Sequence, residues 1–119
     1  MSRSAKAKGR LGQQNIRDKL LETFPEFEKD DIKSAIMGDT GADIQFSPQA
    51  KKKLPLAIEV KRRKAELKTV YSYIEQAVKH GSGEPVVFYR SDKRPWVVMI
   101  GIEHYMDLLR DWNIDGKKV

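Results

Sequence analysis

The chain has 119 residues, a length that predicts one domain with one modest core. Its 23 Lys and Arg residues outnumber its 17 Asp and Glu residues, and the net charge of +6 favours polyanions, nucleic acid first, as partners. The absence of cysteine excludes disulfides, thiolate metal sites and cysteine nucleophiles.

The chain is predicted to begin with a flexible basic arm, residues 1–9, followed by a helix over residues 10–24. The arm contains no acid and is expected to tether phosphates electrostatically, unless it is a terminus without a role. The helix is predicted because apolar residues recur at i, i+4 and i+8 before Pro25, which ends it. The cations of this segment are Arg3, Lys6, Lys8 and Arg10.

Three strands are predicted next, over residues 32–37, 42–46 and 54–60. A glycine-punctuated turn over residues 38–41 separates the first two strands. Ser47-Pro48 is expected to begin a helical turn before the third strand. That third strand reads Leu-Pro-Leu-Ala-Ile-Glu-Val and is expected to be buried, because it is apolar apart from one acid.

The second half is predicted to contain a helix, a hairpin and a closing helix, followed by a polar tail. The order αβββαββα predicts an α/β or α+β domain over residues 10–112, with a mixed central sheet of about five strands flanked by helices. The elements of this half are expected over residues 67–80, 85–89, 96–100 and 102–112, and the tail over residues 113–119.

The candidate site consists of Asp43, Glu59 and Lys61. The period of two in a strand places Glu59 and Lys61 on one face, with Val60 directed to the other face. Asp43 stands at the head of the preceding strand, which can pair with the third strand. Such pairing would bring two carboxylates and one ammonium together at one edge of a sheet.

This combination suits a Mg²⁺ site, because Mg²⁺ binds one or two carboxylates together with waters and phosphate oxygens. Lys61 would orient the attacking water or stabilise charge on the phosphate. These roles are favoured over that of a base, because neighbouring carboxylates hold an ammonium in its charged form. The alternative interpretation is structural, namely a buried Glu59–Lys61 pair and an N-capping Asp43.

Two basic clusters flank the candidate site and are expected to contact phosphates, which positions DNA without reading its sequence. The alternative for the second cluster is a solvated run of charge between a strand and a helix. The clusters are Lys51, Lys52 and Lys53, and Arg62, Arg63 and Lys64.

Gly-x-Asp at residues 41–43 followed by Glu-x-Lys at residues 59–61, in this order of elements, resembles the PD-(D/E)XK nuclease superfamily. Lys8-Gly9-Arg10 and Glu75-Gln76-Ala77 are similar to small archaeal and phage Holliday junction resolvase-like endonucleases. The resemblance implies a restriction-endonuclease-like core, a homodimer, and Mg²⁺ as the cofactor with Mn²⁺ able to substitute.

The resemblance also implies roles for single residues. Asp43 and Glu59 correspond to the metal-binding acids, and the Val60 carbonyl completes the metal shell. Lys61 corresponds to the catalytic lysine, and Gln76 to a helix glutamine near the site. The family usually has a glutamate in its first helix, a few residues after a glycine. This chain has no acid there, and Gln13 occupies that place.

The expected function is therefore a metal-dependent endonuclease that hydrolyses DNA and selects branched structures. The alternatives are a sequence-specific, homing or nicking endonuclease of the same fold, and a non-catalytic nucleic-acid-binding module. No apolar run is long enough to span a membrane, and the basic start lacks a secretory apolar region. We therefore expect no membrane partner and a cytoplasmic location in a bacterial, archaeal or phage-infected cell.

Overall fold

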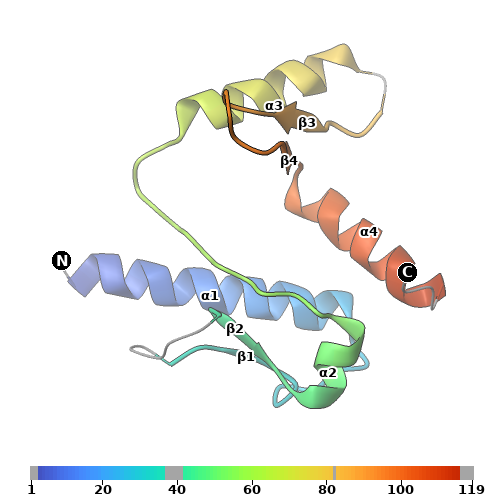
Figure 1. Ribbon diagram of the computed structural model, residues 1–119. Helices are drawn as coiled ribbons and strands as arrows, with labels where there is room; N and C mark the ends of the chain where they lie inside the picture. Colours follow the sequence, from blue (N-terminus) through green and yellow to red (C-terminus); the bar gives the residue numbers. More distant parts are fainter. Residues whose placement is uncertain (1–2, 37–41, 82, 116–119) are drawn as a thin grey trace. The chain divides into compact units, whose positions relative to one another are not determined.

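The computed structural model describes residues 3–36, 42–81 and 83–115 (Figure 1). These residues form four helices and two antiparallel sheets of two strands each, in the order αββααββα. The chain divides into two compact units, Met1–Lys64 and Ala65–Val119. The fold is thus mixed α+β as expected, but the described residues do not show a five-stranded sheet.

The first unit contains α1 (Arg3–Thr23), β1 (Ile32–Ser34), β2 (Ile44–Phe46) and α2 (Pro48–Lys53). Helix α1 starts well before the predicted position, so the described part of the expected arm is helical. Alanine, lysine and arginine dominate this stretch and are good helix formers, whereas its single glycine costs only about 1 kcal/mol. The turn predicted over residues 38–41 lies outside the described residues.

The core of the first unit lies where α1 packs against the β1–β2 sheet (Figure 1). Leu20 and Phe24, one helical turn apart, are fully buried, as are Ile32 of β1 and Ile44 of β2. The strands pair antiparallel with Ile32 opposite Phe46. Burial of each such side chain contributes about 1.5–3 kcal/mol, so this small core holds the helix on the sheet.

The segment over residues 54–60, predicted as the third strand, is not a regular strand. Leu54 is buried, but the Leu56 N–H donates to the Leu54 carbonyl at 2.8 Å, which bends the chain locally. Pro55 has no N–H to give to a ladder. The segment instead meets the sheet through one backbone hydrogen bond, from Asp43 N–H to the Ile58 carbonyl at 2.8 Å.

Helix α2 begins as the sequence predicts, with Ser47 as its N-cap and Pro48 at the first helical position. The Ser47 Oγ accepts from the Ala50 N–H at 3.1 Å and donates to Asp31 Oδ1 at 2.7 Å. The other carboxylate oxygen of Asp31 accepts from the Glu28 N–H at 2.9 Å. The hydrogen bonds from the Glu28 N–H and the Ser47 hydroxyl lower the pKa of Asp31 below its usual value.

The second unit contains α3 (Lys68–His80), β3 (Val87–Tyr89), β4 (Val97–Met99) and α4 (Ile102–Asp115). The predicted helix and hairpin are confirmed here, since β3 and β4 pair antiparallel with Phe88 opposite Val98. Helix α3 ends at Gly81, whose φ of 69° is left-handed and favours glycine. Helix α4 runs past its predicted end at residue 112, so the described part of the expected polar tail is helical.

Candidate functional site

Asp43 links two segments that are distant in the sequence. Its N–H donates to the Ile58 carbonyl at 2.8 Å, and its Oδ2 accepts from the Val60 N–H at 2.6 Å. Its carbonyl accepts from the Ala35 N–H at 2.8 Å, which extends the β1–β2 ladder by one bond. Half-buried Asp43 therefore lies between the sheet and the segment that carries Glu59.

Glu59 and Lys61 lie on the same face of the extended segment. The Lys61 ammonium lies 2.9 Å from Glu59 Oε2, and each side chain is 62% exposed. Exposed ion pairs contribute about 0–1 kcal/mol, so this pair adds little to stability. The structural interpretation expected a buried Glu59–Lys61 pair, whereas the observed pair is exposed. Both charges are therefore accessible to a ligand.

The opposite face of the same segment packs on α1 at Gly12. A Cβ placed on buried Gly12 would lie 3.1 Å from the Arg62 Cβ and 3.5 Å from the Val60 Cγ1. This close approach leaves little room for a side chain at position 12. It fixes which face of the segment is turned toward the helix, and therefore leaves Glu59 and Lys61 on the outer face. Gln13, the next residue of α1, is half-buried.

The carboxylates that the sequence proposes as metal ligands are those of Asp43 and Glu59. One oxygen of each carboxylate has a partner, whereas Asp43 Oδ1 and Glu59 Oε1 have none among the described residues. Within the described ranges no group of three or more His, Cys, Asp or Glu side chains is placed to hold a metal. A single ion with two carboxylates and several waters is within the usual coordination of Mg²⁺.

The predicted phosphate-contacting residues lie in three places. Arg3, Lys6 and Lys8 lie in the part of α1 that was not predicted as helix, and Arg10 lies in the part that was. The α2 cluster is exposed, and Lys53 also lies 3.9 Å from Glu26 Oε2 and 6.0 Å from the centroid of the Phe27 ring. The third cluster, Arg62, Arg63 and Lys64, is exposed directly after the candidate site.

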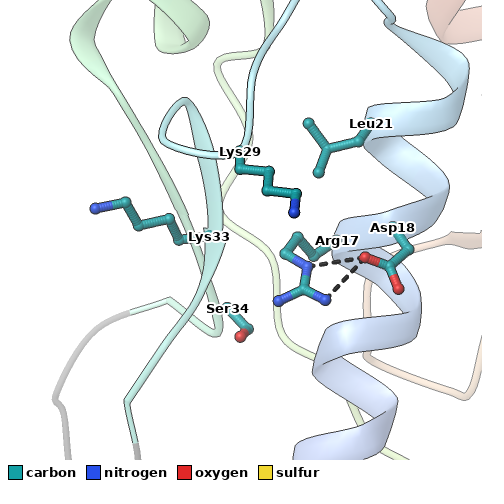
Figure 2. Close-up of a pocket in the computed structure, with 6 residues that line it drawn as sticks. All are labelled: Arg17, Asp18, Leu21, Lys29, Lys33 and Ser34. Atoms are coloured by element: carbon teal, nitrogen blue, oxygen red, sulfur yellow. Dashed lines mark hydrogen bonds and ion pairs between the residues drawn. The ribbon is translucent and has the colours of Figure 1, made fainter.

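A basic pocket between α1 and β1 was not predicted from the sequence (Figure 2). Its volume is about 340 Å³, and Arg17 and Lys29 are directed into it, whereas the Lys33 ammonium points away (Figure 2). Arg17 is held by Asp18, with Nε at 2.9 Å and Nη2 at 2.8 Å from Oδ1. We call this site, lined by Arg17, Asp18, Leu21, Lys29, Lys33 and Ser34, the α1–β1 pocket.

No local pattern in the sequence predicts the α1–β1 pocket. Its cations come from a helix, a turn and a strand, so only the packing of α1 on β1 brings them together. Arg17 and Lys29, which are directed into the pocket, outnumber its one acid, Asp18, and the resulting net charge of +1 favours an anionic ligand.

Gln76 lies on α3, in the second unit, and is exposed. It lines a pocket of about 340 Å³ together with Tyr73, His80 and residues of the hairpin. The role that the resemblance implies for Gln76 therefore stays a prediction.

Comparisons of the chain with protein families, with curated proteins and with solved structures find no match. None of the described helices is long and apolar enough to cross a membrane.

Proposed function

We propose that the chain is a divalent-metal-dependent endonuclease that hydrolyses DNA phosphodiester bonds with Asp43, Glu59 and Lys61. The observation that carries the proposal is the double hydrogen bond of Asp43 to the segment of Glu59, through the Ile58 carbonyl and the Val60 N–H. It supports the proposal because it holds Asp43 against the segment of Glu59 and Lys61, and two acids and an ammonium are the groups that phosphoryl chemistry needs.

The two carboxylates are the proposed metal ligands, through Asp43 Oδ1 and Glu59 Oε1. The Val60 carbonyl and Gln13 are further candidates for the metal or its waters, as the resemblance implies. When bound, Mg²⁺ or Mn²⁺ supplies a Lewis acid that polarises the phosphate and lowers the pKa of a bound water.

Lys61 is proposed to act on the scissile phosphate directly. Its ammonium is exposed and lies 2.9 Å from Glu59 Oε2. A charged ammonium cannot accept a proton, so Lys61 orients the water or stabilises negative charge in the transition state. Removal of one such group typically lowers the rate by about 100- to 1,000-fold.

The basic residues are proposed to position the DNA backbone. The clusters next to the candidate site and the α1–β1 pocket with Arg17 and Lys29 would each hold phosphates. Contacts of this kind do not read bases, which suits an enzyme that selects the shape of its substrate.

The finer expectations from the sequence belong to the same proposal. They are the restriction-endonuclease-like core with its five-stranded sheet, the preference for branched DNA, the homodimer, the role of Gln76 and the cytoplasmic location. They rest on the resemblance and on the chemistry of the site residues.

A second candidate function is a non-catalytic nucleic-acid-binding module. The Glu59–Lys61 ion pair and the hydrogen bond from Val60 N–H to Asp43 favour it, because both interactions use the candidate catalytic groups structurally. In such a module the acids would hold the segment in place, and the basic residues alone would bind nucleic acid.

Cleavage assays separate the two functions. The wild type, Lys61→Ala and Asp43→Asn are incubated with a four-way junction, linear duplex DNA and duplex RNA, in Mg²⁺, Mn²⁺ or EDTA. The matched control is Lys79→Ala, which removes an exposed lysine of α3 that belongs to none of the proposed sites. We expect metal-dependent cleavage of DNA, about 100-fold slower or more in Lys61→Ala and Asp43→Asn, and little changed in Lys79→Ala.

Two results would contradict the proposal in different ways. If the wild type binds DNA but cuts no substrate in either metal, the binding module is the better description. If Lys61→Ala and Asp43→Asn cut as fast as the wild type, the chain is a nuclease whose site lies elsewhere.

A further inference from the structure

One face of the β3–β4 hairpin carries two exposed aromatic side chains. The register pairs Phe88 with Val98, and side-chain alternation puts Arg90 and Trp96, nearer the turn, on this same face. The Arg90 Cζ lies 6.0 Å from the centroid of the Trp96 ring. Phe88 is 68% exposed, Trp96 63% and Val98 54%. We call Phe88, Arg90, Trp96 and Val98 the aromatic face.

The other face of the hairpin is turned toward α3. There Tyr89 stacks on Tyr73 of α3, with ring centroids 5.8 Å apart and planes 28° apart. Val87 and Met99, which pair across the hairpin on the face of Tyr89, are half-buried. The aromatic face is opposite the face on which Tyr89 stacks, and the exposure of its rings is not explained by packing within the hairpin.

The turn of the hairpin is basic. Arg90, Lys93 and Arg94 outnumber the one acid, Asp92, so the turn carries a net charge of +2. Lys93 has a φ of 64°, a left-handed conformation that glycine or asparagine adopts more easily. The turn thus has a cation at a position where glycine would be less strained.

We propose that the aromatic face binds unpaired bases of single-stranded DNA segments, with the turn holding their phosphates. Every base offers a flat ring that stacks on phenyl or indole groups, and the phosphates match the basic turn. This inference rests on the proposed function in taking DNA as the ligand, and it adds the feature recognised: bases released from pairing, as at a branch, flap or frayed end. A purely apolar partner would leave the charge of the turn unmatched.

The test measures DNA binding by the full chain in EDTA, so that no cleavage occurs. Trp96 and Trp112 are the two tryptophans, and a Trp112→Phe background leaves Trp96 as the one indole reporter. Titration with a poly(dT) oligonucleotide is expected to quench Trp96 fluorescence by stacking, whereas a blunt duplex of equal length leaves it nearly unchanged.

In the wild-type background, Phe88→Ala and Trp96→Ala are each expected to weaken binding of poly(dT) by about 5- to 100-fold, as loss of one stacked base does. Neither change should alter binding of the blunt duplex. The matched control is Tyr71→Ala, which removes a ring of α3 that is 57% exposed but lies outside the aromatic face. Circular dichroism and thermal melting check that the variants remain folded, which is the expected result because Phe88 and Trp96 are mostly exposed.

Three results would overturn the inference. One is saturation with poly(dT) without quenching of Trp96. Another is an equal loss of affinity for duplex and poly(dT) in Phe88→Ala and Trp96→Ala. The third is unchanged poly(dT) binding together with loss of self-association in these variants, which would make the aromatic face a protein interface. Metal-dependent cleavage without quenching of Trp96 fluorescence would contradict only this inference. Quenching of Trp96 without cleavage would contradict only the proposed nuclease activity.

Discussion

The carboxylate of Asp43 accepts a hydrogen bond from the backbone N–H of Val60 at 2.6 Å, across 17 positions of the sequence. The same side chain is a proposed metal ligand through its other oxygen. Asp43 would therefore have a structural role through Oδ2 and a chemical role through Oδ1, and substitutions of different kinds should separate them.

Asp43→Ala should lower the free energy of unfolding by about 1–2 kcal/mol, because it removes a charged acceptor from a half-buried N–H. Asp43→Asn keeps an oxygen that can accept from Val60 N–H and should lose less than half as much. Both variants should lose Mg²⁺ binding, because each removes the charge. Urea unfolding and calorimetric Mg²⁺ titration measure the two effects. An asparagine variant that binds Mg²⁺ like the wild type would contradict the ligand role.

Gly12→Ala tests the contact of α1 with the segment of the candidate site. Alanine in place of a helical glycine is worth about 1 kcal/mol in helix propensity. At Gly9 nothing lies within 4 Å of an added Cβ, so Gly9→Ala should raise the free energy of unfolding by about that amount. At Gly12 the added Cβ would lie 3.1 Å from the Arg62 Cβ, and the gain should be lost. Equal stabilisation of both variants in urea unfolding would show that the segment moves away without cost.

Stability at acid pH depends on Asp31. Its pKa is lowered in the folded state by the Glu28 N–H and the Ser47 hydroxyl, so the ionised form favours folding. This contribution is complete above the usual pKa of 3.8 and is lost as the pH falls through the lower, folded-state value. Asp31→Asn should therefore be less stable than the wild type near neutral pH and should lose less stability on acidification.

Urea unfolding at several pH values between about pH 7 and about pH 3 measures this difference. The control is Asp30→Asn, which changes the adjacent, exposed aspartate. Parallel pH profiles for the wild type and Asp31→Asn would refute the assignment.

The α1–β1 pocket should contribute to the salt dependence of DNA binding. Arg17→Ala and Lys29→Ala should each weaken binding of duplex DNA, and each should reduce the slope of log K against log salt by about 0.9 if one phosphate contact is lost. Lys79→Ala, an exposed lysine of α3, serves as the control for loss of one positive charge. Fluorescence anisotropy at several salt concentrations gives the slopes. Identical slopes in all three variants would show that the pocket does not hold a phosphate.

Patterns within a few residues were sufficient for most elements. Leu20 and Phe24 are one helical turn apart and are buried as that spacing predicts. Ser47 caps α2, and the β-rich runs over residues 85–89 and 96–100 form the hairpin. The period of two correctly placed Glu59 and Lys61 on one face. These features depend on contacts between near neighbours in the chain, and such contacts are encoded by the local order of residue types.

What the sequence by itself determined is thus the local structure and the types of chemical group that the candidate site contains. The tertiary structure decided which of these groups meet: Asp43 with Val60, Gly12 with Arg62, and Arg17 with Lys29 in one pocket. It also decided that the segment over residues 54–60 is not a regular strand. The physical reason is that a strand needs hydrogen-bond partners, and a pocket needs walls, from segments whose approach depends on the packing of the whole unit.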